Sequence, residues 1–117
     1  MDIYVIGSCN ATLRSGKYSV VLDDNGDKDV FSNKCFAKSS NAALLQGIKD
    51  GISRCKNHDN VKVYVNTSVG WNNKNKSKNK MLIESIQSDC LKRDITVNVI
   101  ENTDTTFVKQ IVTDYTM

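Results

Sequence analysis

The first third of the chain contains three short runs of β-branched, aromatic and polar residues, a composition typical of β-strands. The runs cover residues 2–8 (DIYVIGS), 17–22 (KYSVVL) and about 29–37 (DVFSNKCFA). Between the second and third runs, Asn25 and Gly26 in the sequence DDNGD tolerate a positive φ and favour a tight turn. Three strands joined by short connections predict an antiparallel meander.

The hydrophobic period then changes to that of a helix. Within residues 39–55, apolar side chains recur every three or four positions and define one helix face. These positions are Leu45, Ile48, Ile52 and Cys55. Ser40 or Asn41 is a suitable N-cap for this helix. Gly47 and Gly51 lie one turn apart, so the helix is expected to approach a sheet closely, at some cost in helix propensity.

The second half of the chain alternates between strand and helix patterns. Strands are predicted at 61–65 (VKVYV) and 95–100 (ITVNVI), and helices at about 79–93 and 104–115. The order is therefore βββαβαβα, without an internal repeat or a linker. It predicts one α/β domain over residues 1–117, with a five-stranded mixed sheet and helices on its faces.

Composition narrows the classes of protein that fit this pattern. The 117 residues are 39% hydrophobic and 25% charged, as in globular domains, and no apolar run is long enough to span a bilayer. The four cysteines form no C-x-x-C pair and His58 is the only histidine, so we expect free thiols and no zinc site. With no leader pattern, the chain is expected to be intracellular and cytoplasmic. Abundant Lys and absent Pro are the bias of an AT-rich genome, and leave a viral or mobile-element origin open.

Residues 71–80 (WNNKNKSKNK) are the most distinctive polar segment. They carry Lys74, Lys76, Lys78 and Lys80 and no acidic residue. Alternate lysines in a loop can follow a phosphate backbone, and Trp71 could stack on a base or a sugar. The alternative is a solvated, flexible loop enriched in lysine by coding bias, with Trp71 covering the core. The net charge of +3 favours a nucleic-acid partner only weakly.

The element order and three local motifs resemble the ribonuclease H fold over nearly the whole chain. Active members of that family have a first strand close to I-Y-T-D-G-S, compared with IYVIGS at residues 3–8 here. Their first helix opens T-N-N-x-x-E-L-x-A-x, compared with SSNAALLQGI at residues 39–48. Their fourth strand ends I-Y-T-D-S, compared with VYVNT at residues 63–67. Each motif is weak alone, but the three occur in the right order on the right elements.

The resemblance implies a chemistry whose residues are missing here. The family hydrolyses phosphodiesters with two Mg²⁺ ions held by four carboxylates. We assign these four positions to Ile6, Ala43, Asn66 and, in the least secure register, Lys109. We therefore expect a pseudo-nuclease with no catalytic residue, no metal and no cofactor. Asp104 is the best candidate to rescue a metal site, although a capping role at the last helix is the better expectation.

The resemblance also indicates which residues to test for binding. Ser39, Ser40 and Asn41 occupy the place where active relatives contact the substrate, and Arg14 and Lys17 in the first hairpin could extend the same face. If Lys109 points into the former metal pocket, its ammonium would neutralise phosphate or local dipoles where Mg²⁺ is bound in active relatives. The alternative is a Lys109 that faces solvent.

Three functions stay open from the sequence. The first is an inactive domain that binds duplex nucleic acid or an RNA–DNA hybrid through its former substrate face and the lysine-rich loop. The second is a protein-interaction module on the same scaffold. The third is an enzyme that uses residues not identified here. A membrane partner is not expected.

Overall fold

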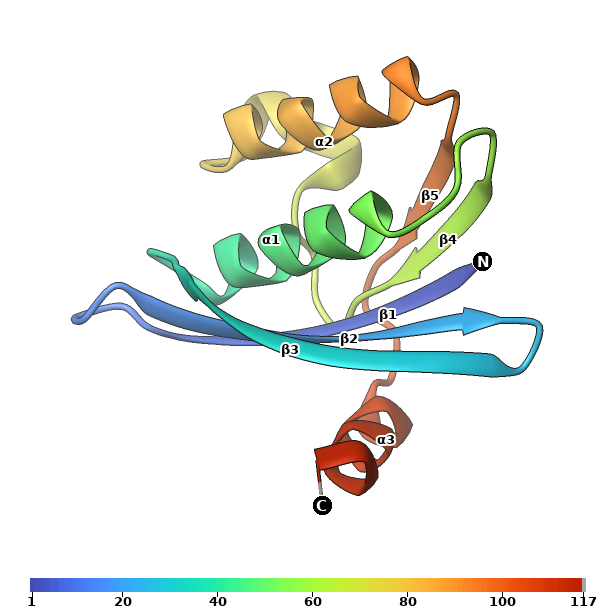
Figure 1. The fold of residues 1–117 in the computed structure, drawn as a ribbon. Coiled ribbons are helices and arrows are strands. Elements are labelled where there is room, and N and C mark those ends of the chain that lie inside the picture. Colours follow the sequence, from blue (N-terminus) through green and yellow to red (C-terminus); the bar gives the residue numbers. More distant parts are fainter. Residues whose placement is uncertain (117) are drawn as a thin grey trace.

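Five strands form one mixed sheet in the computed structural model, which describes residues 1–116 (Figure 1). The strands are β1 (Asp2–Asn10), β2 (Ser15–Asp24), β3 (Asp27–Phe36), β4 (Asn60–Tyr64) and β5 (Thr96–Ile100). The helices are α1 (Ser40–Ser53), the 3-10 helix η1 (Trp71–Lys76), α2 (Lys80–Lys92) and α3 (Thr106–Thr116). No helix in this described part of the chain is long and apolar enough to cross a membrane.

The strands lie in the order β3-β2-β1-β4-β5. The first three pair antiparallel, whereas β4 pairs parallel with both β1 and β5. The predicted mixed sheet of five strands is therefore confirmed. The β1–β2 hairpin is longer than predicted, because its backbone pairing continues past the apolar runs to Asn10 and Ser15.

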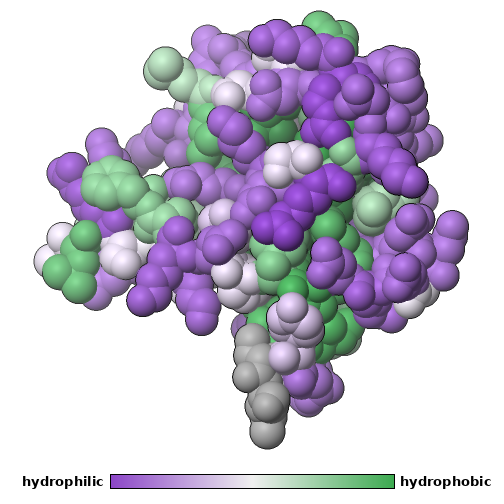
Figure 2. All heavy atoms as spheres, viewed as in Figure 1, coloured by the Kyte–Doolittle hydropathy of each residue, from purple (hydrophilic) through white to green (hydrophobic). Residues whose placement is uncertain are grey.

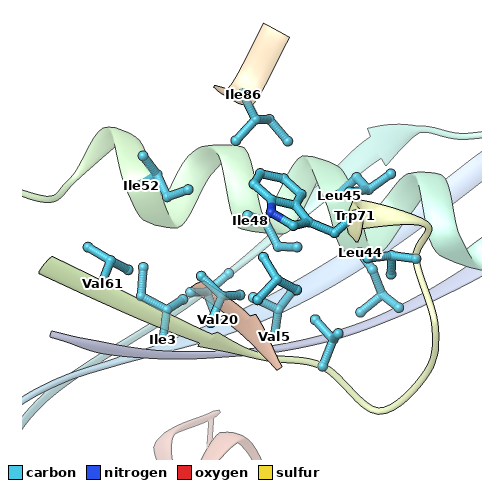
Figure 3. Close-up of a cluster of buried hydrophobic side chains, with 14 of the residues drawn as sticks. Ile3, Val5, Val20, Leu44, Leu45, Ile48, Ile52, Val61, Trp71 and Ile86 are labelled. Carbon is cyan, nitrogen blue, oxygen red and sulfur yellow. The ribbon is translucent and has the colours of Figure 1, made fainter. Parts of the chain in front are cut away.

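Two helices cover one face of the sheet and a single helix covers the other. Figure 1 shows α1 and α2 together on one side, with α3 alone on the opposite side. The main core lies under α1, where side chains such as Ile3, Val5, Leu45 and Ile48 are fully buried (Figure 3). As its glycines predict, α1 packs tightly: a Cβ on Gly47 would lie 2.6 Å from Cγ1 of Val5.

The segment after β4 differs from the flexible loop considered for it. Gly70 has a φ of 82° and redirects the chain into η1, whose first residue, Trp71, is only 7% exposed. Figure 3 shows the indole among Leu45, Ile48 and Ile86, between α1 and α2. Burial of the aromatic side chain thus fixes the start of the lysine-rich segment against the core.

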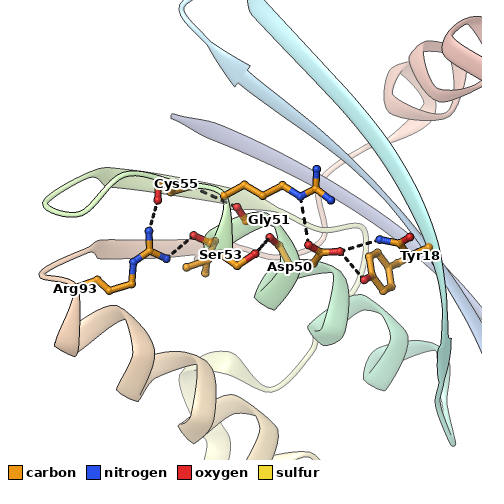
Figure 4. Close-up of polar contacts among 9 residues, drawn as sticks. Tyr18, Asp50, Gly51, Ser53, Cys55 and Arg93 are labelled. Carbon is orange, nitrogen blue, oxygen red and sulfur yellow. Dashed lines mark hydrogen bonds and ion pairs between the residues drawn. The ribbon is translucent and has the colours of Figure 1, made fainter.

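A polar cluster attaches α1 to the meander. The carboxylate of Asp50 accepts hydrogen bonds from Tyr18 Oη at 2.6 Å, from Asn33 Nδ2 at 3.0 Å and from Arg54 Nε at 3.3 Å (Figure 4). Desolvation by burial raises the pKa of Asp50, but these hydrogen bonds outweigh it and the net pKa is lowered. Burial and the bond to Asp50 raise the pKa of Tyr18 to about 12. At neutral pH the cluster therefore holds a charged Asp50 and a neutral Tyr18.

This cluster predicts a specific dependence of stability on pH. Because the pKa of Asp50 is lower in the folded state, its contribution is present above the unfolded pKa of about 3.9 and is lost as pH falls through the folded pKa. We expect Asp50→Asn to lower the free energy of unfolding by about 1–2 kcal/mol at pH 7, and by less near pH 3. Urea denaturation from pH 3 to pH 7 measures both values. Asp29→Asn, at an exposed carboxylate on β3, is the control; equal losses for Asp50→Asn at pH 3 and pH 7 would contradict the assignment.

Candidate functional site

A pocket of about 450 Å³, here named the β1 pocket, lies between the sheet and α3. Its walls are Ile6, Gly7 and Ser8 from β1, Lys17 and Ser19 from β2, Asn66 from the segment after β4, and Lys109, Val112 and Thr113 from α3. The parallel pairing of β1 with β4 brings the segment after β4 beside the second half of β1. Packing of α3 across β1 and β2 closes the remaining side.

Three of the four positions assigned to missing metal ligands line this one pocket. Ile6, Asn66 and Lys109 come from three elements that are far apart in the sequence, yet they line the same cavity. Lys109 lines the pocket and is also exposed to solvent. Ile6 is half-buried and packs against the small apolar cluster under α3, which includes Val21 and Val108.

The fourth assigned position, Ala43, does not line the β1 pocket. It is fully buried in a separate small cluster with Ala37 and Ala42. Its neighbour Leu44 packs on Gly7 instead: a Cβ at Gly7 would lie 3.3 Å from Cγ of Leu44. Consecutive helical residues point about 100° apart, so an error of one residue selects the wrong face. Leu44 is also the sixth residue of the run SSNAALLQGI, where the family motif has its glutamate.

The chemistry of the β1 pocket suits an anion. Its polar lining consists of two lysines, three hydroxyl side chains and one amide, and it contains no carboxylate. Hard divalent cations need anionic oxygen ligands, which the lining does not offer. Throughout residues 1–116, no group of three or more His, Cys, Asp or Glu side chains could hold a metal ion.

Asp104 does not line the β1 pocket. Its Oδ1 accepts hydrogen bonds from the backbone N–H of Thr106 at 3.0 Å and from the Thr106 hydroxyl at 2.7 Å. These bonds lower the pKa of Asp104, which is exposed. Because Thr106 is the first residue of α3, the N-cap position is Thr105 rather than the predicted Asp104. Asp104 binds the first residue of the helix from one position earlier.

A second pocket of about 420 Å³, here named the α1 groove, is lined by four of the ten predicted binding residues. Its lining is Ser39, Asn41, Ser68, Val69, Gly70, Asn73, Lys76, Ser77, Lys78 and Asn79. The N-cap of α1 is Ser39, whose Oγ accepts from the N–H of Ala42 at 3.1 Å, so the predicted N-cap at Ser40 or Asn41 is wrong. Asn41 instead donates from Nδ2 to the carbonyl of Ser68 at 3.1 Å, across the groove.

The remaining predicted binding residues lie outside the α1 groove. Lys17 lines the β1 pocket, whereas Arg14 is exposed in the turn between β1 and β2. Lys74 donates to Oε1 of Gln87 on α2 at 3.1 Å, and Lys80 pairs with Glu84 at 3.8 Å. Ser40 is the exposed first residue of α1.

Trp71 requires a correction as well. Its indole lies in the core and has no open face on which a base could stack, so the predicted stacking role is replaced by the alternative, a cover for the core. Because Trp71 begins η1, its burial also determines where the following lysines lie. Lys76 and Lys78 are exposed and line the α1 groove, while Lys74 is directed to α2.

Segment 65–70 contributes residues to both pockets, and the carboxylate of Glu101 accepts a hydrogen bond from its backbone. Asn66 lines the β1 pocket, and the last three residues of the segment line the α1 groove. Glu101, just after β5, accepts a hydrogen bond at Oε2 from the N–H of Val69 at 2.5 Å. Thr103 donates its N–H to the carbonyl of Val65 at 2.9 Å. Sequence reasoning missed Glu101, because an isolated acid after a strand carries no motif.

No model of a protein family matches the chain, and no curated protein is similar enough to count as a relative.

Proposed function

We propose that the chain is a degenerate ribonuclease H-like domain that binds nucleic acid, as a duplex or an RNA–DNA hybrid, and does not cleave it. The assignment to this superfamily is supported by the order of the elements and by the antiparallel meander followed by two parallel strands. It is also supported by the pocket that Ile6, Asn66 and Lys109 line together. These three residues are far apart in the sequence, and only the comparison with the family motifs grouped them.

The absence of carboxylates from both pockets carries the proposal. The chain has 13 acidic residues, yet none lines the β1 pocket or the α1 groove, which together contain Lys17, Lys76, Lys78 and Lys109. The other lining residues are mainly serine, asparagine and glycine, whose short side chains leave the backbone accessible. Cationic and hydrogen-bonding groups without competing acids are what a polyanionic backbone requires.

Binding without cleavage follows from the same lining. Two-metal hydrolysis needs carboxylates that hold both ions and so generate the nucleophile. Ile6, Asn66 and Lys109 line the β1 pocket at three of the four positions assigned to metal ligands. Leu44, next to the fourth position in the sequence, packs on Gly7 of this pocket. None of these side chains is a carboxylate. An ammonium neutralises a phosphate but neither activates water as a metal does nor binds Mg²⁺.

Fluorescence anisotropy with labelled single strand, duplex and RNA–DNA hybrid tests this function. We expect affinity in EDTA that falls steeply with salt, because each phosphate contact contributes about 0.7–0.9 to the slope of log K against log salt. Absence of binding to all three probes at 20 mM salt would overturn the proposal. Incubation of the hybrid with Mg²⁺ or Mn²⁺ is expected to leave it intact, and turnover would overturn the non-catalytic part.

A protein-interaction module is the second candidate, favoured by exposed apolar side chains at one end of the sheet. Leu13 is 71% exposed in the β1–β2 turn and Phe36, at the end of β3, is 67% exposed. Phe36 pairs in register with Ser15, the first residue after the β1–β2 turn. Phe36 and Leu13 therefore lie at the same end of the sheet. Figure 2 shows hydrophobic side chains at this end, among mostly hydrophilic ones. Failure of every nucleic-acid probe would favour this function.

A further inference from the structure

We propose that the β1 pocket is a metal-independent phosphate site, in which the ammonium groups of Lys17 and Lys109 supply the positive charge. The proposal deepens the proposed function, on which it rests for the identity of the ligand as a nucleic-acid phosphate. The pocket itself can be tested with inorganic phosphate, without any nucleic acid.

The positions of the two lysines are the first argument. Lys17 is on β2, directly opposite Ser8 of β1 in the strand register, and Lys109 is on α3. Both line one cavity, and neither forms an ion pair with any residue of the described chain. Two ammonium groups facing one pocket repel each other, and an anion between them relieves that repulsion. The lining of the pocket therefore carries two positively charged side chains and no negatively charged one.

The neutral side chains provide the second argument. Some already make hydrogen bonds within the described part of the protein, whereas others make none there and can donate to a ligand. Ser19 shares a hydrogen bond of 2.6 Å with Ser32, and the Thr113 hydroxyl donates to the carbonyl of Lys109 at 2.8 Å. Within residues 1–116, the side chains of Ser8 and Asn66 make no hydrogen bond, and both are exposed. A hydroxyl and an amide N–H are donors that phosphate oxygens accept. Two charges and two neutral donors thus line the cavity.

The residues that line the β1 pocket explain why we expect it to bind phosphate without a metal ion. Mg²⁺ would enter a pocket that has two ammonium groups and no carboxylate, so its own charge is repelled and its preferred ligands are missing. A phosphate needs no bridging ion there, because lysine binds phosphate directly as a point charge. Chelation of divalent ions should therefore leave binding unchanged.

The direct test is a titration of ¹⁵N-labelled protein with inorganic phosphate in EDTA, followed by amide chemical shifts. We expect saturable shifts confined to the β1 pocket, near Ser8, Lys17, Asn66 and Lys109. Lys109→Gln is expected to raise the Kd at least fivefold, and Lys109→Arg, which retains the charge, is expected to restore binding. Lys28→Gln removes one charge from an exposed position on β3 outside both pockets and should leave the Kd unchanged.

Three results would overturn this inference. They are shifts spread over surface lysines in general, an unchanged Kd in Lys109→Gln, and phosphate affinity that requires added Mg²⁺. A ¹H–¹⁵N spectrum with the native dispersion confirms that each variant is folded before its Kd is used.

Nucleic-acid binding by the same variants separates the two proposals. Loss of one phosphate contact in Lys109→Gln should lower the salt slope by about 1, equally in EDTA and in Mg²⁺. If phosphate binds in the pocket but no nucleic acid binds, the phosphate site stands and the proposed function fails. If nucleic acid binds with an unchanged slope in Lys109→Gln, the function stands and the phosphate site fails.

Discussion

Replacement of Trp71 by alanine is expected to lower the free energy of unfolding by about 3–5 kcal/mol, the range for removal of a buried large aromatic side chain. Trp71 is only 7% exposed and lies in the main core beside Leu45, Ile48 and Ile86 (Figure 3). Its loss would leave a cavity between α1 and α2 and release the start of η1. Urea denaturation at pH 7 measures the change.

Trp71→Phe is the matched variant, because it retains an aromatic ring and should recover part of the lost stability. Lys74→Ala, three residues later on the half-exposed side of η1, should change stability by well under 1 kcal/mol. A stacking role would give the reverse result for Trp71→Ala: native stability together with weakened nucleic-acid binding. That outcome would contradict the buried position.

The double substitution Lys76→Glu/Lys78→Glu is expected to have the largest effect on binding. Both lysines are exposed and line the α1 groove, so reversing their charges replaces two attractions to phosphate with two repulsions. We expect the affinity for duplex at moderate salt to fall on the order of 100-fold, and the salt slope to fall by about 2. Anisotropy titrations from 20 to 200 mM salt measure both quantities.

Lys28→Glu/Lys56→Glu is the control for net charge, since both lysines are exposed and neither lines a described pocket. It changes the charge by the same amount and should lower affinity only slightly. Equal losses for the two double variants would indicate attraction by overall charge and contradict a defined binding surface. Thermal unfolding of both variants shows that the comparison is between folded proteins.

Hydrophobic periodicity predicted the regular elements because it reflects one-sided burial. The steps of three and four from Leu45 to Ile52 correspond to the face of α1 that packs on the sheet, and Cys55, beyond the end of the helix, is buried in the same core. Strand ends were less accurate: β2 continues to Ser15 and Asp24, where backbone pairing persists although the side chains are exposed. Backbone hydrogen bonds leave no signal in hydropathy, so the sequence shows only the buried part of a strand.

The segment after β4 shows a limit of local reasoning. Residues 71–80, nine polar side chains and one tryptophan, predicted a loop. Trp71 was given two opposite interpretations, stacking on a base and covering the core. Tertiary packing decided between these, because the space between α1 and α2 accepts the indole. The same packing separated Lys74, which bonds to α2, from Lys76 and Lys78 in the α1 groove.

The sequence by itself determined the α/β class, the five strands and three longer helices, and the absence of carboxylates from the motif positions. These properties depend on residue type and on spacing along the chain. Only the tertiary structure decided that Ile6, Asn66 and Lys109 share a cavity with Lys17, and that Glu101 holds the segment between the pockets. The physical reason is that strand pairing and helix rotation set which distant side chains meet, and neither is encoded in local spacing.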